Sequence, residues 1–149
     1  TRQDVTDLPS VTGDRYDEAE GMRRGGYVVM DAPSAEVTLV ANGSEVSLLC
    51  QVAVLLEAEG VKARVVSVPS LGLFEDQDED YRQSVIPAGI PVFGLTAGLP
   101  STLRGVCGPR ARVYGLDRFG ASAPYKVLDE KFGFTPQNIL REVLAFIGR

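Results

Sequence analysis

The stretch Glu36-Val-Thr-Leu-Val-Ala41, followed by Asn42-Gly-Ser-Glu45, decides the fold of this chain. Its first half is a nearly continuous apolar run, as expected for a parallel strand that is covered on both faces. A helix should begin at Ser44, whose hydroxyl can cap the backbone amides of the first turn. The apolar residues that follow recur at helical spacing until Gly60 ends the helix: Val46, Leu49, Cys50, Ala53 and Leu56.

The alternation of strand and helix continues along the chain. Further strands are predicted at 27–30, 61–67, 90–95 and 111–116, and further helices at 78–85, at 125–132 and from Thr135 onward. Thr135 is a suitable N-cap, and Pro136 fits the first helical position. We therefore predict an open, doubly wound, mostly parallel α/β sheet of about five strands, flanked by helices and joined by right-handed crossovers.

Residues 1–24 differ from the rest of the chain. They are polar and show no helical or strand period, which predicts a linker or extended arm, whereas the α/β domain occupies residues 25–149. The first residue is Thr1 rather than Met. We expect the chain to be a fragment in which residues 1–24 are a linker or the tail of a preceding domain.

Composition disfavours several kinds of partner. The formal net charge is −5 and no basic stripe is present, so we expect no nucleic-acid partner. No stretch approaches about 18 apolar residues, so we expect no membrane span. The two cysteines are far apart, and Cys50 lies in an apolar helical pattern, which predicts a buried, reduced thiol. Reduced thiols indicate a cytoplasmic location.

The chain contains no histidine. A Ser-His-Asp triad, a Cys–His pair and a histidine-based zinc site are therefore excluded, and two separated cysteines cannot form a structural zinc site. We predict that this chain contributes no catalytic, cofactor-binding or metal-binding residue. Autonomous enzyme activity is not expected.

Gly43, Ser44 and Glu45 lie where the first parallel strand turns into its helix. Ligands of open α/β sheets bind at this edge, and helix N-termini attract anions, so these residues are a candidate anion or phosphate site. The alternative is purely structural, with Ser44 as a cap and Glu45 placed favourably against the helix dipole. A single glycine lacks the Gly-x-Gly-x-x-Gly spacing of pyrophosphate loops, and Glu45 would repel an anion, which favours the structural alternative.

The run Glu75-Asp-Gln-Asp-Glu-Asp80 holds five acids in six positions. Clustered carboxylates can coordinate a hard cation, but the alternating spacing of an EF-hand loop is absent. Acids in the first turn of a helix stabilise it through the helix dipole. A solvated, helix-starting acidic run is therefore favoured over a metal site.

The loop Gly115-Leu-Asp-Arg-Phe-Gly-Ala-Ser-Ala-Pro124 combines charge, an aromatic ring and small residues after the last strand. Aromatic and arginine side chains are enriched in binding hot spots, so the loop is a candidate contact with a second subunit or another domain. The alternative is a self-braced turn in which Asp117 caps local amides or pairs with Arg118. The candidate contact residues are Asp117, Arg118, Phe119, Ser122 and Pro124.

Four separated motifs, in order, resemble the C-terminal domain of transketolase, and the resemblance runs in register from about Gly25 to Gly148. They are Asn42-Gly-Ser-Glu-Val46, Val65-Val-Ser-Val-Pro-Ser70, Tyr81-Arg-Gln-Ser-Val-Ile-Pro87 and the loop 115–124. Related domains occur in deoxyxylulose-phosphate synthase and in the β-subunits of 2-oxo-acid dehydrogenases. The last two motifs favour transketolase over both.

The resemblance implies a thiamine-diphosphate enzyme that transfers a two-carbon ketol unit between sugar phosphates in the pentose phosphate pathway. In that family the preceding domains hold the cofactor, its divalent metal (Mg or Ca) and the acid-base histidines at a homodimer interface. The C-terminal domain contributes to packing and the dimer, so the implied partners are the missing N-terminal catalytic domains and a second subunit. The main alternative is a free-standing α/β module that binds a small phosphorylated metabolite at residues 43–45.

The chain departs from the family's usual pattern in two places. Where the family generally reads Val-Glu-Ala-Gly, this chain has Leu95-Thr-Ala-Gly98, so that Thr96 replaces a carboxylate. The tryptophan that usually follows has no counterpart here. Interactions that the family makes through that acid are therefore not expected in this chain.

Overall fold

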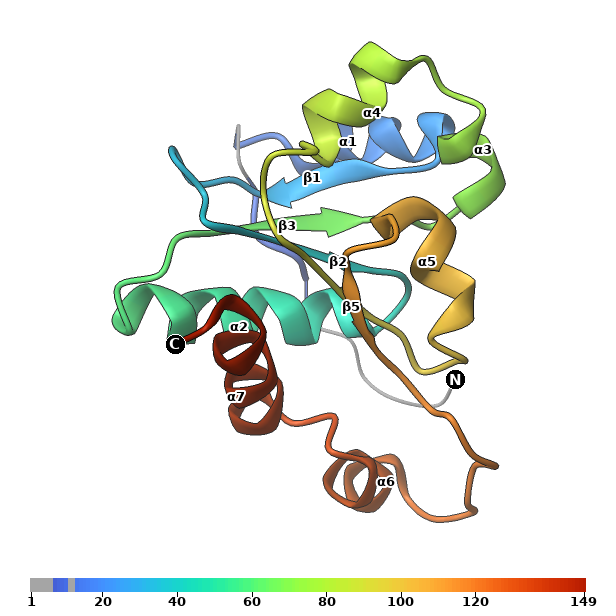
Figure 1. Cartoon of the computed structure of the whole chain (residues 1–149). Coiled ribbons are helices and arrows are strands. Elements are labelled where there is room, and N and C mark those ends of the chain that lie inside the picture. Colours follow the sequence, from blue (N-terminus) through green and yellow to red (C-terminus); the bar gives the residue numbers. More distant parts are fainter. Residues whose placement is uncertain (1–6, 11–12) are drawn as a thin grey trace.

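Five strands form a single sheet in the order β1-β3-β2-β4-β5 in the computed structural model, which describes residues 7–10 and 13–149 (Figure 1). The strands are β1 (Tyr27–Met30), β2 (Val37–Ala41), β3 (Ala63–Ser67), β4 (Val92–Leu95) and β5 (Arg112–Tyr114). β1 runs antiparallel to β3, and the other three pairs are parallel. The predicted mostly parallel α/β sheet is confirmed.

Each predicted helix and strand begins and ends within two residues of its predicted bounds. The helices from β2 onward are α2 (Glu45–Ala58), α3 (Leu71–Glu75), α4 (Glu79–Val85), α5 (Ser101–Cys107), α6 (Tyr125–Phe132) and α7 (Pro136–Ile147). The sequence does not predict α3 and α5, because both are short and neither has a side-chain cap at its first turn, whereas α4, also seven residues long, begins at the Asp78 cap.

The segment before Gly25 is not an extended arm where the structure describes it. Residues Arg15–Ala19 form α1, and Glu20–Arg24 form the 3-10 helix η1. The Asp14 carboxylate caps α1 by accepting from the amides of Tyr16 and Asp17. η1 has no side-chain cap and no buried residue, so this segment carries no apolar period from which its helical turns could be predicted.

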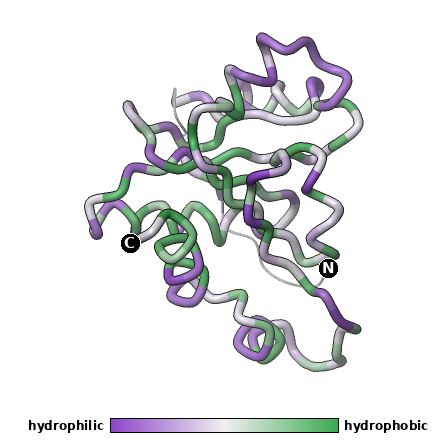
Figure 2. The backbone as a smooth tube through the Cα atoms, in the orientation of Figure 1, coloured by the Kyte–Doolittle hydropathy of each residue, from purple (hydrophilic) through white to green (hydrophobic). Residues whose placement is uncertain are grey.

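Strand β2 lies at the centre of the sheet and is buried along its whole length. Alternate side chains face two separate apolar clusters. Val37, Leu39 and Ala41 join the cluster beneath α2 and α7, whereas Val40 joins the cluster beneath α3, α4 and α5. Figure 2 shows the hydrophobic residues concentrated along the central strands and hydrophilic residues along α4.

Gly25 joins the N-terminal segment to the domain. It ends η1 with a positive φ of 86°, and its carbonyl accepts from the Ser70 amide at 3.1 Å. A Cβ atom at position 25 would lie 2.3 Å from the backbone nitrogen of Phe74, so only glycine allows this close approach. The Arg24 guanidinium lies 3.3 Å from the centroid of the Tyr81 ring and reinforces the same junction.

Gly25→Ala should lower the free energy of unfolding by about 3 kcal/mol or more. The alanine would have to adopt a left-handed backbone conformation, and its Cβ would also clash with the backbone of Phe74. The matched control is Gly60→Ala, where φ is also positive but no atom lies within 4 Å of an added Cβ. We expect that control to cost only about 1–2 kcal/mol. Urea unfolding of both variants would measure the difference, and equal losses would show that Gly25 does not fix the junction.

Candidate functional site

The carboxyl ends of β2 and β4 meet at the point where the sheet reverses its winding. Helix α2, which follows β2, packs on one face, whereas α3–α5, which follow β3 and β4, pack on the other. Ala41 and Leu95, the last residues of β2 and β4, are partners in the register. Open α/β sheets bind ligands at such switch points, so this edge is the first place to look for a site.

Gly43, Ser44 and Glu45 do lie at this edge, but Ser44 is not the predicted cap. Its backbone is already helical (φ −65°, ψ −25°), and its side chain makes no cap hydrogen bond. A capping residue needs an extended backbone to aim its oxygen at the first-turn amides. The Ser44 hydroxyl instead donates to Glu45 Oε1 at 2.8 Å. A carboxylate thus lies beside the start of α2, where its charge would repel a phosphate.

The polar groups of the turn after β4 also hydrogen-bond to other groups of this chain. The buried Thr96 hydroxyl accepts from the Gly98 amide at 3.1 Å. The Thr96 amide donates to the Tyr114 carbonyl, and the Leu116 amide donates to the Gly98 carbonyl at 2.9 Å. Thr96 therefore braces its own turn, and its side chain supplies no charge in place of the family's carboxylate.

The loop 117–124 is exposed throughout. The Phe119 side chain is 99% accessible, and the Arg118 guanidinium lies 5.0 Å from the Phe132 ring centroid. Within the described residues, no ion pair or side-chain hydrogen bond connects Asp117 with Arg118, so that form of the self-braced alternative is absent. Ser122 is also exposed, and the Pro124 carbonyl accepts the first amide bonds of α6.

The loop and α6 form an arm that leaves the sheet after β5 (Figure 1). No residue of α6 is buried, and Val127 is exposed beside the loop. The far end of the arm is anchored, because the Tyr114 hydroxyl donates to the Phe132 carbonyl at 2.8 Å and Asn138 Nδ2 donates to the Gly133 carbonyl at 3.0 Å. The anchoring role of Tyr114 could not be predicted from the sequence. The arm is held in place but uncovered.

The acidic run is divided between two helices. Glu75 ends α3, Asp78 caps α4 by accepting from the Tyr81 amide at 2.7 Å, and Glu79 and Asp80 lie in the first turn of α4. The predicted helix-starting role is thereby confirmed for its second half. In the described ranges, no group of three or more potential ligands among His, Cys, Asp and Glu could hold a metal ion.

Both thiols are free and buried, as predicted for Cys50. Burial raises the pKa of Cys50 to about 11 and that of Cys107 to about 12. Thiols with such pKa values stay protonated near neutral pH, so neither is an activated nucleophile. Among the residues that the structure describes, no helix has the length and apolar character needed to cross a membrane.

Comparison with known proteins agrees with this geometry. Residues 25–135 match the family model described as the transketolase-like TK C-terminal domain. The chain is 45% identical over 116 residues to the plasmid transketolase of Cupriavidus necator, covering 78% of this chain and 17% of that protein. It is 41% identical to the transketolase of Staphylococcus aureus over 85% of this chain and 19% of that protein.

Solved structures give the same result. The transketolase of Leishmania mexicana superposes with a TM-score of 0.80 at 40% identity, covering 87% of this chain and 19% of that one. A complex of the Pichia stipitis transketolase with sedoheptulose 7-phosphate superposes with a TM-score of 0.81 at 31% identity, covering 96% and 20%. The chain thus spans about a fifth of the length of these relatives. It belongs to the transketolase family, as a transketolase C-terminal domain.

Proposed function

We propose that this chain serves as the accessory C-terminal domain of a transketolase that transfers a two-carbon ketol unit between sugar phosphates in the pentose phosphate pathway. The full-length relatives are transketolases and are about five times longer than the matched segment. The chain itself has no histidine to act as the general acid-base group of such a reaction. Both cysteines are buried and free, which fits a reducing, cytoplasmic location.

In this proposal the preceding domains hold thiamine diphosphate and its Mg or Ca ion. The carboxyl edge of this sheet does not fit the cofactor. A pyrophosphate needs a glycine-rich loop whose amides converge on it, whereas here a single glycine is followed by Glu45, whose carboxylate accepts from Ser44. We therefore assign no step of the reaction to residues of this chain.

The role we propose for the domain is assembly. The observation that carries it is Phe119, which is 99% exposed at the tip of an anchored loop, beside an arginine. An exposed aromatic side chain beside an arginine is the combination enriched at binding hot spots, and covering it with a partner would bury a large apolar area. We propose that the loop 117–124 contacts a second subunit or the preceding catalytic domains.

The isolated chain should neither bind thiamine diphosphate nor transfer ketol units, because it lacks a pyrophosphate cradle and an acid-base histidine. Calorimetric titration with thiamine diphosphate and magnesium should release no heat above dilution. The complete protein, titrated in parallel, should bind. Micromolar binding by the isolated chain would show that the cofactor site has been misplaced.

The double change Arg118→Ala, Phe119→Ala in the complete protein should weaken assembly at least roughly tenfold, because each side chain is the hot-spot type. Sedimentation velocity across a dilution series would measure the dissociation constant. Val54→Ala is the matched control, since Val54 is also an exposed apolar residue but lies on α2. If the isolated domain unfolds instead and assembly of the complete protein is unchanged, the loop is an internal brace.

The alternative function, a free-standing module that binds a phosphorylated metabolite, predicts that Ser44→Ala reduces sugar-phosphate binding. Our account predicts no binding to lose. It also predicts a stability change below about 0.5 kcal/mol, because Ser44 makes no cap bond. Asp78→Ala, which removes a real cap, should cost about 1 kcal/mol in the same unfolding assay. Saturable binding of ribose 5-phosphate that Ser44→Ala abolishes would favour the alternative.

A further inference from the structure

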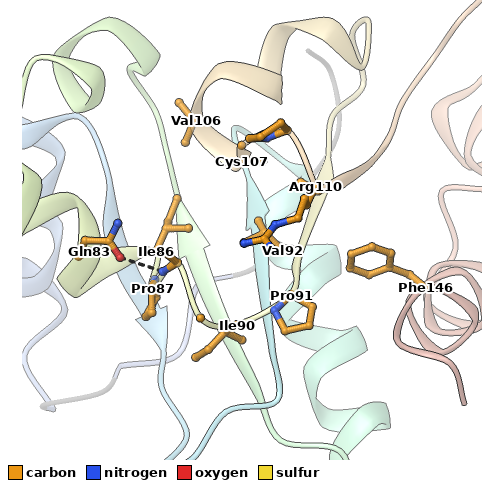
Figure 3. A pocket seen from close by; sticks show the side chains of 15 residues that line it. Gln83, Ile86, Pro87, Ile90, Pro91, Val92, Val106, Cys107, Arg110 and Phe146 are labelled. Atoms are coloured by element: carbon orange, nitrogen blue, oxygen red, sulfur yellow. Dashed lines mark hydrogen bonds between the residues drawn. The ribbon is translucent and has the colours of Figure 1, made fainter.

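A cavity of about 740 Å³ opens at the amino ends of β4 and β5, on the opposite edge of the sheet from the loop 117–124 (Figure 3). Its walls come from the end of α4, the segment 86–92, the segment 106–111 and Phe146 of α7. This volume is typical of small-molecule sites. The sequence does not predict this cavity, because the lining residues come together only when β4 and β5 pair.

The cavity has an apolar floor and a fixed rim. The buried residues Ile86, Val92 and Cys107 form the floor. Three prolines, at positions 87, 91 and 109, restrict the backbone around the opening. The Gln83 carboxamide oxygen accepts from the Ala88 amide at 2.8 Å and secures the segment between α4 and β4. The cavity is therefore preformed, which lowers the entropic cost of binding.

Arg110 is the one charged residue among those that line the cavity. Figure 3 shows its side chain directed toward Val92, inside the ring of lining residues. Within the described part of the chain, its guanidinium has no ion pair and no hydrogen bond, whereas neighbouring Arg112 pairs with Glu142 and Arg64 pairs with Asp31. The cavity is thus a local cationic site in a chain of net charge −5.

We propose that this cavity binds a small amphipathic carboxylate, with its apolar body on the floor and its carboxylate on Arg110. Arg110 is exposed to solvent, and its guanidinium matches a carboxylate through two parallel N–H···O bonds. A sugar phosphate would use Arg110 alone, because its hydroxyls gain nothing from contact with the buried apolar side chains of Ile86 and Val92. The proposed ligand is therefore chemically distinct from the substrates in the proposed reaction.

The test is calorimetric titration of the complete protein with 2-naphthoate and with its neutral counterpart 2-naphthamide. We expect 2-naphthoate to bind and 2-naphthamide to bind roughly tenfold or more weakly. Arg110→Gln should weaken 2-naphthoate roughly 10- to 100-fold, the range expected for losing a charged hydrogen bond, and should abolish the preference over the amide.

Two further variants test whether 2-naphthoate binds in this cavity. Arg104→Gln makes the same charge change on an exposed residue of α5 that does not line the cavity, so it should leave binding unchanged. Ala88→Trp places a bulky side chain at the exposed rim and should block binding even if Arg110→Gln fails to fold. The proposal is overturned if the native protein binds neither probe, as would happen if another part of the protein fills the cavity. It is also overturned if Arg104→Gln weakens 2-naphthoate binding as much as Arg110→Gln does, or if Ala88→Trp leaves that binding unchanged.

Discussion

The complete burial of β2 is the constraint on which the rest of the structure depends. A strand with parallel partners on both sides and apolar clusters on both faces cannot slip by one residue, because a slip would exchange the side chains of the two faces. α2 must therefore cover one face and α3–α5 the other. Because the helices that follow β2 and β4 cover opposite faces, the winding of the sheet reverses between these two strands. The loop after β5 lies at the same edge of the sheet as the carboxyl ends of β2 and β4.

At this edge of the sheet, polar groups of the chain form hydrogen bonds with one another. Ser44 donates to Glu45, the Thr96 hydroxyl accepts from Gly98, and the Gly98 carbonyl accepts from Leu116. A site that must bind a cofactor would leave such groups free to meet it. The most exposed aromatic side chain beyond this edge is Phe119, on an arm anchored by Tyr114. This combination is the basis of our proposal that the loop 117–124 serves assembly.

The fold could be predicted from the sequence because its strands and longer helices repeat at regular periods, as in residues 36–60. Predictions failed where stability came from single contacts. The helical turns at 15–24 are held by the Asp14 cap of α1 and by the contact of Arg24 with Tyr81, and η1 buries no residue. Ser44 has the right residue type for a cap but the wrong backbone angles, which only the structure supplies. The cavity beside Arg110 depends on packing between segments distant in sequence, for which no local pattern exists.

The central claim is that this 16.0 kDa chain works as one domain of a longer transketolase. The most direct measurement is the intact mass of the native gene product, purified from its own cell without proteolysis. The account predicts a mass several times 16.0 kDa, in keeping with relatives of which the chain spans 17–19%. A native product close to 16.0 kDa would contradict it and would favour a free-standing α/β module.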